Sequence, residues 1–354
     1  MNDSFPKKSI LSTQIDLSKF RPIDRREKEN ADVMPEASTF FKDAMKRFRR
    51  NPLGMAALVM LVLILVLIIS SAFFCPYSYS EILSLDGVRD ITAKNLKPLQ
   101  YSERELEAIA NGAKIFPHLF GTDELCRDYF ARTMAGTRIS LFVGVFASLI
   151  VLVIGSIYGS VSGLAGGKTD MIMMRIVDII YSMPDMLLVI LLSVVLGSVL
   201  PKNSTGLFGR LGPNMVSLFI VFALLYWVGM ARLVRGQILT IRENDYIQAA
   251  RMIRTPRSRM IKKHILPNCI SIILISATMQ IPSAIFTESY LSFVGLGVQV
   301  PMPSLGALAN TARSSMQMYP YKLFFPSLMI ALIVLSFNLL GDALRDAFDP
   351  QQKK

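Results

Sequence analysis

Six long apolar runs constrain this chain more than any other feature of its sequence. A helix needs about 20 mainly apolar residues to cross the roughly 30 Å hydrocarbon layer of a bilayer. Several of these runs lack the polar face that a helix of a soluble protein carries. The six runs lie at about 53–75, 139–163, 176–200, 214–234, 267–294 and 323–341. We therefore predict an all-α polytopic membrane protein with six transmembrane helices.

The composition agrees with a membrane protein and excludes several roles for the charged residues and cysteines. Hydrophobic residues make up 52% of the chain and charged residues 18%, whereas an ordinary soluble domain has roughly 25% charged residues. The net charge of +12 is not accompanied by a nucleic-acid-binding motif, so we expect no nucleic-acid partner. The 3 cysteines and 2 histidines lack the spacing of a disulfide framework or a zinc site, and we predict no metal site.

Basic residues orient the predicted spans. One basic cluster precedes the first span, and a second lies between the fourth and fifth spans. The clusters contain Lys42, Lys46, Arg47, Arg49 and Arg50, and Arg235, Arg242, Arg251, Arg254, Arg257, Arg259, Lys262 and Lys263. Lysine and arginine are enriched in cytoplasmic loops, so both regions are expected to be cytoplasmic. With six spans, both the N- and C-termini then lie in the cytoplasm.

This topology predicts a division of the chain into five parts. They are a cytoplasmic N-terminal region, 1–51; a first transmembrane helix, 52–75; an extracytoplasmic insert, 76–136; a membrane domain, 137–345, with a cytoplasmic loop at 241–266; and a cytoplasmic tail, 346–354. Within the insert, Ser102 and Glu105 form a capping-box pattern for a helix that ends near Gly112. Residues 38–50 fit either a helix on an anionic membrane surface or a plain cytoplasmic helix.

The basic loop between the fourth and fifth spans is patterned as more than a connector. Tyr246, Ala249, Ala250 and Ile253 fall on one face of a short helix. Pro256 ends that helix, and Pro267 suits the first turn of the next one. A short helix with a small apolar face, held beneath the membrane, suits docking of a cytoplasmic partner. The alternative interpretation is a solvated basic loop.

The same loop resembles the EAA loop of permeases of binding-protein-dependent ABC importers. Gln248, Ala249 and Ala250 stand at the EAA positions, and Leu266 with Pro267 matches the Leu-Pro ending. Arg254 stands at the position where the family pattern has glycine, which usually lets the chain turn after the helix.

Four further blocks resemble the C-type subunit of peptide importers. They are NPLGMAALVMLVLI at 51–64, FGTDELCRDYFARTMAGTRISLFVGV at 120–145, ESYLSFVGLGVQVPMPSLGALA at 288–309 and LLGDALRDAFDPQ at 339–351. Cys126 replaces a usual glycine, and Leu305 stands where tryptophan is common. The likeness covers about residues 38–350 in order.

The resemblance implies a type I ABC importer permease fold in the cytoplasmic (inner) membrane, surrounded by lipid. It implies three kinds of protein partner: a second homologous permease, two cytoplasmic ATPase subunits and an extracytoplasmic substrate-binding protein. Peptides are the implied substrate, with nickel or another small solute as the alternative. The residues that it assigns to ATPase coupling are Tyr246, Gln248, Ala249, Ala250, Arg251, Ile253, Arg254, Leu266 and Pro267.

Two sets of residues within the spans have open interpretations. Gly155, Gly159 and Gly163 recur every four residues, a spacing that allows close helix packing, either inside the subunit or at a subunit interface. Asp185 and Glu288 are ionisable groups in or near spans, where such groups are costly and often face a partner or a water cavity. They are candidates for the translocation path, with ion pairing and helix-end solvation as alternatives.

No residue set predicts catalysis. The run GLAGGKTD resembles the end of a phosphate-binding loop, but Ser162 stands where that motif requires glycine. We expect ATP and Mg²⁺ to be bound by the partner ATPases, with no cofactor in this chain. Two rival classes remain. A secondary transporter driven by an ion gradient would favour inverted repeats with broken helices, and no clear repeat is visible. A membrane-embedded enzyme would need an HExxH motif or paired aspartates, and neither is present.

Overall fold

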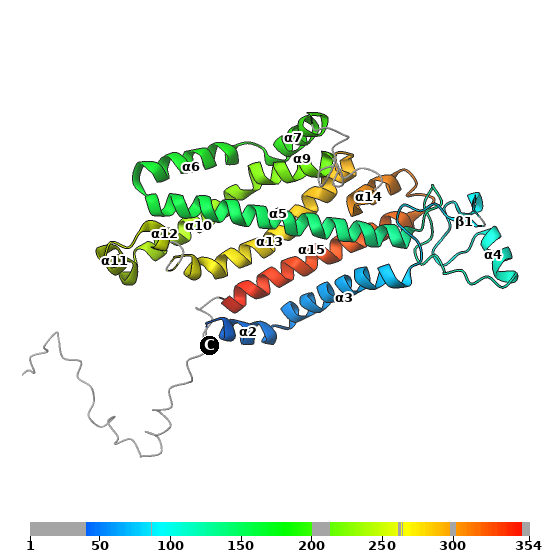
Figure 1. The fold of residues 1–354 in the computed structure, drawn as a ribbon, viewed down its shortest axis with the longest axis horizontal. Coiled ribbons are helices and arrows are strands. Elements are labelled where there is room, and N and C mark those ends of the chain that lie inside the picture. Colours follow the sequence, from blue (N-terminus) through cyan, green and yellow to red (C-terminus); the bar gives the residue numbers. More distant parts are fainter. Residues whose placement is uncertain are drawn as a thin grey trace, which may run out of the picture. The chain divides into compact units, whose positions relative to one another are not determined.

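The computed structural model describes residues 40–85, 87–199, 213–260, 263, 265–297 and 302–348. The chain separates into two compact units, Met1–Lys46 and Arg47–Lys354. The first unit contributes the start of helix α2 (Phe40–Arg50), so the helix predicted at 38–50 is present from Phe40. The second unit is a bundle of long helices with a small insert at one end (Figure 1).

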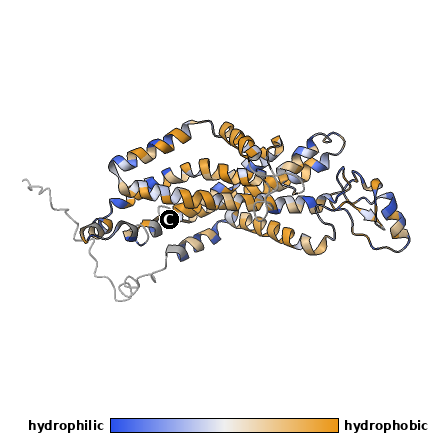
Figure 2. Ribbon diagram, turned by 45° about the horizontal axis from the view of Figure 1, so that its top comes forward, coloured by the Kyte–Doolittle hydropathy of each residue, from blue (hydrophilic) through white to orange (hydrophobic). Residues whose placement is uncertain are grey.

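Within the described residues, 5 helices are long and apolar enough to cross a membrane, and a bent helix pair raises this number to 6. The continuous spans are α3 (Pro52–Phe74), α5 (Tyr129–Ala165), the stretch Asn214–Arg242, α13 (Leu266–Val294) and α15 (Pro320–Phe348). The stretch Asn214–Arg242 consists of α9 (Pro213–Val221), a π-helical segment (Phe222–Tyr226) and α10 (Trp227–Arg242). Hydrophobic residues dominate the middle of the helices, and hydrophilic residues gather toward their ends (Figure 2). The polytopic all-α prediction is confirmed.

The third predicted span, 176–200, is present as a broken helix pair rather than one straight helix. The chain forms α6 (Gly167–Ser182) and α7 (Asp185–Val199), which are bent by 87° relative to each other. The break lies at Met183 and Pro184. Proline lacks the backbone N–H and restricts the residue before it to an extended conformation, and Met183 has the extended φ and ψ of −84° and 144°.

Two helices extend well beyond their apolar runs. The second predicted span begins at Tyr129 rather than 139, because the carboxylate of Asp128 caps it by accepting from the Ala131 N–H. The fourth continues to Arg242 rather than 234. Hydropathy alone does not locate these helix ends, because the terminal turns contain polar residues. Local hydrogen bonds satisfy these residues, so the helix continues past its apolar run.

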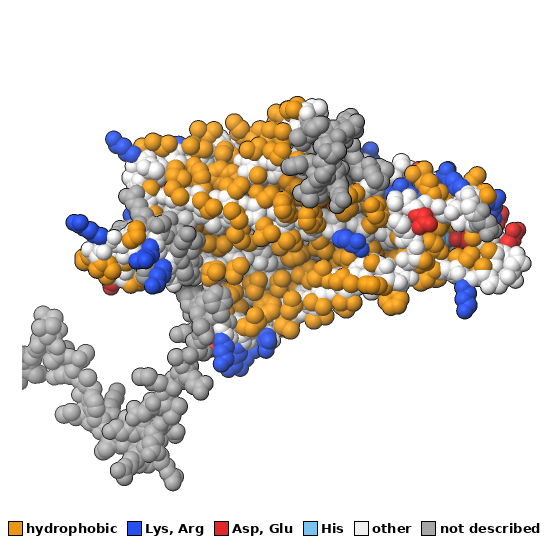
Figure 3. Space-filling view, in the orientation of Figure 1, with side chains coloured by type: hydrophobic (Ala, Val, Ile, Leu, Met, Phe, Trp, Pro, Cys, Tyr) orange, Lys and Arg blue, Asp and Glu red, His pale blue; other side chains and the backbone are white. Residues whose placement is uncertain are grey.

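The helices bury one face each against α5 and its neighbours. On α3, six small or aliphatic positions repeat every three or four residues on the buried face: Gly54, Ala57, Leu61, Ile64, Ile68 and Ser71. Ile64 and Ile68 belong to the same core cluster as Met329 and Ile333 of α15. The opposite face of α3 is left uncovered, with Val62, Leu63 and Ile69 more than 45% exposed. Apolar side chains cover the broad middle of the face shown in Figure 3, and most charged side chains lie toward its ends.

The insert is a small region with its own hydrophobic cluster between α3 and α5. It contains a two-stranded antiparallel hairpin of β1 (Ser84–Leu85) and β2 (Val88–Arg89), a 3₁₀ turn (Ile91–Ala93) and α4 (Glu103–Ala110). The predicted capping box is present: Ser102 accepts from the Glu105 N–H, and Glu105 accepts from the Ser102 N–H. The helix ends at Ala110, and Gly112 follows with a φ of +92°.

A buried histidine joins the insert to the start of α5. Both ring nitrogens of His118 contact carboxylates, at 2.9 Å from Glu105 and 2.8 Å from Asp128. Burial opposes a charge on the ring, but the hydrogen bonds to Asp128 and Glu105 outweigh it and raise the pKa of His118 to about 9. Because Asp128 also caps α5, this charged triad fixes α4 against the first turn of a membrane helix.

Candidate functional site

The candidate site is the short helix α11 (Asp245–Met252), which follows α10 after a joint of two residues, Glu243 and Asn244. The joint is closed by hydrogen bonds. The Asn244 N–H donates to the Ile241 carbonyl at 3.1 Å, and the Ile247 N–H donates to the Asn244 carbonyl at 3.0 Å. Helix α11 therefore follows α10 through a short, hydrogen-bonded joint. It lies at the end of the bundle opposite the insert (Figure 1).

The inner face of α11 is anchored in the core of the membrane domain. Ile247 is fully buried and Ala250 is 7% exposed. Both pack in one cluster with Ile238 of α10, Met260 and Ile265. The sequence analysis grouped Ala250 with Tyr246, Ala249 and Ile253 on one face, whereas Ala250 is buried in this cluster. Its part in ATPase coupling stays a prediction. Because successive helical residues are separated by about 100°, Ala250 follows Ile247 on the inner face and Ala249 does not.

The outer face of α11 is apolar and uncovered. Tyr246 is 44% exposed, Met252 82% and Ile253 79%, and Ala249 is exposed beside them. We call Tyr246, Ala249, Met252 and Ile253 the docking face. Met252 was missed in the sequence analysis, although its spacing of three from Ala249 could have found it. Contiguous exposed apolar patches rimmed by polar residues mark sites of contact with proteins or membranes.

The end of α11 explains the glycine of the family pattern. Arg254 has a φ of +53°, the left-handed region that glycine adopts without steric cost. The Thr255 N–H donates to the Ala250 carbonyl at 3.1 Å, which is the six-residue bond of a Schellman motif with Arg254 at its left-handed position. The turn is thus retained with an arginine in place of glycine.

Cys126, in the insert, is a second residue with a positive φ at a position where the family pattern has glycine. It replaces a usual glycine of the family pattern and has a φ of +61°. Its side chain is 1% exposed in the small core of the insert. Both departures from family glycines therefore fall on backbone positions that favour glycine.

Polar contacts fix the rest of the loop. The Asn268 side-chain amide donates to the Tyr246 hydroxyl at 2.9 Å and so links α11 to the start of α13. The Gln248 amide donates to the Glu243 carbonyl at 3.2 Å. The side chains of Arg251, Leu266 and Pro267 lie outside the described part of the structure.

Gly155, Gly159 and Gly163, which we call the glycine stripe of α5, lie against α10. A Cβ atom on Gly155 would lie 2.6 Å from the Met230 Cβ, and one on Gly159 would lie 2.4 Å from the Ala231 carbonyl oxygen. A Cβ on Gly163 would lie 2.9 Å from Ile238. Such distances are below van der Waals contact, so the stripe brings α5 and α10 together inside the subunit. Helix α11 continues from this tightly packed α10.

The two candidate path residues have different positions. Glu288 of α13 is fully buried, and its carboxylate accepts from the hydroxyls of Ser140 at 2.9 Å and Ser292 at 2.8 Å. Ser304, which caps α14 (Leu305–Arg313), donates to the Ser292 hydroxyl at 3.1 Å. Glu288 thus faces hydroxyls of its own chain. The side chain of Asp185 lies outside the described part, and a path role for either residue stays a prediction.

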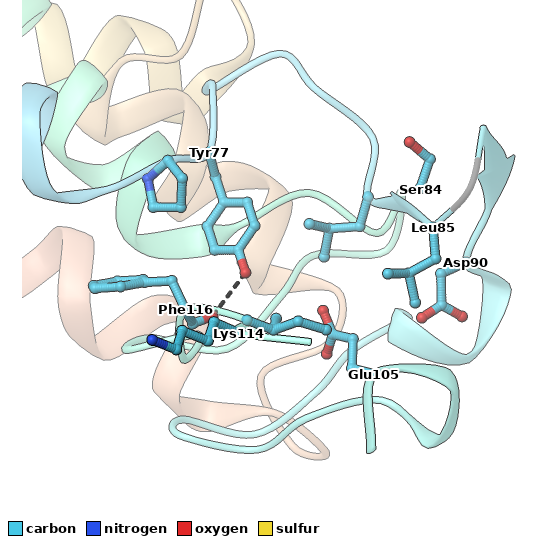
Figure 4. Close-up of a pocket in the computed structure, with 10 residues that line it drawn as sticks. Tyr77, Ser84, Leu85, Asp90, Glu105, Lys114 and Phe116 are labelled. Carbon is cyan, nitrogen blue, oxygen red and sulfur yellow. Dashed lines mark hydrogen bonds between the residues drawn. The ribbon is translucent and has the colours of Figure 1, made fainter. Parts of the chain in front are cut away.

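Two hollows lie away from the docking face. A pocket of about 210 Å³ opens in the insert, where the Tyr77 hydroxyl donates to the Phe116 carbonyl at 2.7 Å (Figure 4). The Glu105 carboxylate at its wall is already bonded to His118. A second pocket of about 340 Å³ lies at the α6–α7 break. It is lined by Ile180, Tyr181, Met183, Pro184, Leu188, Leu225 and Val228.

Comparisons with known proteins give a consistent result along the chain. The family model described as "Binding-protein-dependent transport system inner membrane component" matches residues 152–354. A second model, "N-terminal TM domain of oligopeptide transport permease C", matches residues 39–98.

Curated relatives match over nearly the full length of both chains. The oligopeptide transport system permease protein OppC of Bacillus subtilis is 40% identical over 95% of this chain and 97% of its own length. The dipeptide transport system permease protein DppC of the same organism is 37% identical over 94% and 92%. OppC of Haemophilus influenzae is 36% identical over 91% and 92%. Among solved structures, a chain of the inward-facing MetNI methionine ABC transporter aligns at 19% identity with a TM-score of 0.48, covering 61% of this chain and 96% of that chain.

Proposed function

This chain belongs to the family of binding-protein-dependent transport system inner membrane components, and we propose that it is one of two permease subunits of an ATP-driven peptide importer. It is a multi-pass membrane protein. In this proposal the α11 end of the bundle is cytoplasmic and the insert is extracytoplasmic. The proposal also makes both chain termini cytoplasmic, as the positive-inside rule predicts.

The observation that carries the proposal is the docking face. Four apolar or aromatic side chains are exposed on a helix whose opposite face is buried in the membrane domain. A surface of this kind suits a cytoplasmic ATPase subunit, because burial of exposed apolar area favours association. The inner anchors Ile247 and Ala250 would carry the motion of that partner into α10.

The proposed cycle follows from two-state energetics. A binding protein delivers substrate from outside to a cavity between this chain and a homologous permease. ATP binding closes the two ATPases, and closure displaces α11. ATP can shift the permease between inward- and outward-facing states only if the ATPases bind the two states with different affinity. The chain itself supplies no catalytic group in this scheme, and ATP and Mg²⁺ are held by the ATPases.

Peptides are the proposed substrate because the relatives matched over most of their length are oligopeptide and dipeptide permeases. Nickel or another small solute is the runner-up within the same architecture. A secondary transporter driven by an ion gradient is the runner-up from another class.

Uptake by the reconstituted importer tests the proposal. The chain is assembled in proteoliposomes with its second permease, ATPases and binding protein, and uptake of a labelled tripeptide is measured. We expect uptake that requires ATP and the binding protein and that persists when ion gradients are collapsed. Uptake that follows a proton or sodium gradient without ATP would contradict the importer. Uptake of nickel ions without competition by peptides would contradict the substrate.

A further inference from the structure

Two ion pairs join α6 to α10. Helix α10 continues into α11, which we call the docking helix. Arg235 binds Asp170 through two parallel bonds of 2.6 Å each, from Nε to Oδ1 and from Nη2 to Oδ2. Arg232 binds Asp178 at 2.6 Å. The pairs lie eight residues apart on α6 and hold it to α10 at two separate points.

The first pair is a junction of three helices. The Ser162 hydroxyl of α5 donates to Asp170 Oδ1 at 2.5 Å, on the same carboxylate that receives Arg235. The side chain of Asp170 is only 12% exposed. Bidentate arginine–carboxylate pairs fix orientation as well as distance, so the start of α6 has a defined position against α5 and α10.

The second pair extends toward the break after α6. The side chains of Arg232 and Asp178 are 37% and 50% exposed. The Arg232 guanidinium also lies over the Tyr181 ring, 4.2 Å from its centroid. Tyr181 precedes the break at Met183 and Pro184 by two residues. Arg232 therefore contacts α6 at the last turns before the chain bends by 87° into α7.

Apolar packing holds α6 along one narrow face only. Val177 is fully buried against Trp227, Val228 and Ala231 of α10. Met174 and Ile180 are partly buried against the same cluster, whereas Ile172 and Ile179 face outward and are each 60% exposed. Figure 1 shows α6 at the edge of the bundle. The charged contacts therefore add to this apolar packing in holding α6 against α10.

We propose that Asp170–Arg235 and Asp178–Arg232 make α6 and α10 one transmission arm, which carries displacement of the docking helix to the break at Met183 and Pro184. The inference rests on the proposed function, because it assumes that a partner displaces α11. The joint between α10 and α11 has only two residues and is hydrogen-bonded. A movement of α11 therefore reaches α10, and the ion pairs pass it to α6 and the start of α7. These four charged residues are positioning residues and need no contact with substrate.

A pairwise substitution cycle in the reconstituted importer tests the arm. Asp178→Asn, Arg232→Gln and the double variant are compared with wild type for peptide transported per ATP hydrolysed. Arg175→Gln, on an exposed position of the same helix, is the matched control. Asn and Gln keep the side-chain size, and co-purification of the ATPases in wild-type yield identifies assembled variants. Wild type must first show ATP-dependent peptide uptake, and its failure would contradict the proposed function rather than the arm.

The arm predicts that each single variant lowers peptide transported per ATP at least about fivefold, the low end of ordinary coupling between sites. The double variant should lose no more than either single variant, because the two residues act as one pair. ATP hydrolysis itself should persist. Unchanged peptide per ATP in both single variants would overturn the proposal, and so would independent losses that multiply in the double variant. The control should retain the wild-type ratio in either case.

Discussion

The Thr255 N–H closes the docking helix by donating to the Ala250 carbonyl at 3.1 Å, a bond that requires the intervening Arg254 to adopt a φ of +53°. A side chain in this region clashes with its own backbone at a cost of roughly 1–2 kcal/mol. The same turn would form without that cost if glycine stood at Arg254.

Arg254→Gly should therefore stabilise the protein by about 1 kcal/mol, since the exposed arginine side chain loses little packing. Thermal unfolding in detergent measures the effect. Arg175→Gly is the control, because Arg175 is exposed in the interior of α6, where glycine should cost about 1 kcal/mol. Equal destabilisation by both substitutions would contradict the strained turn.

Substitution by glutamate should have opposite effects at Ala249, which is exposed, and at Ala250, which is buried. Ala250→Glu places a charge among Ile247, Met260 and Ile265 and should cost at least about 3 kcal/mol of stability. Ala249→Glu lies on the docking face, so stability should change by less than about 0.5 kcal/mol while ATPase association weakens. Thermal unfolding and co-purification of the ATPases separate the two effects. A stable Ala250→Glu variant would show that the inner face is not packed.

Gly159→Ala should destabilise the protein by about 1–3 kcal/mol, because the added Cβ would lie 2.4 Å from the Ala231 carbonyl oxygen. Gly229→Ala on α10 is the same substitution with no atom within 4 Å of the added Cβ. It should be neutral or stabilising by up to about 1 kcal/mol, since alanine favours the helix. Comparable unfolding temperatures for the two variants would mean that α5 and α10 are not in close contact.

The stability of the insert should fall as the pH rises through about 9. His118 has a folded-state pKa of about 9 against a reference value of 6.5, so its contribution is complete below the lower value and is lost above the higher one. Unfolding of wild type and His118→Gln is compared from pH 6 to pH 10. The difference between them should shrink toward alkaline pH, and a constant difference would argue against a charged His118.

Length and hydropathy were sufficient to predict the five continuous membrane helices, because a run of about 20 apolar residues is long enough to cross a bilayer as one helix. Pro184 marks the place of the α6–α7 break, but the sequence could not give its angle of 87°, since proline permits either a kink or a sharp bend and tertiary packing decides which. Helix ends such as Tyr129 and Arg242 were missed because their polar residues are satisfied by caps and ion pairs.

The docking helix was predictable as an element but not in its orientation. The periodicity grouped Ala249 with Ala250, whereas burial of Ile247 rotates Ala250 inward. His118 gave no signal, because its partners lie 13 and 10 residues away and only the folded insert brings them together. The glycine positions now held by Arg254 and Cys126 were recognisable from the family resemblance, and their positive φ values supply the physical reason.

Site-specific cross-linking tests the central claim, that the outer face of α11 binds the ATPase. A photo-reactive residue is placed at Ile253, which is 79% exposed, and at two controls in the assembled importer. The controls are Leu63, on the exposed face of α3, and the exposed Leu106 of the insert. We predict a cross-link to an ATPase subunit from Ile253 and none from either control. An ATPase cross-link from Leu106, or its absence from Ile253 in a complex that transports peptide, would contradict the account.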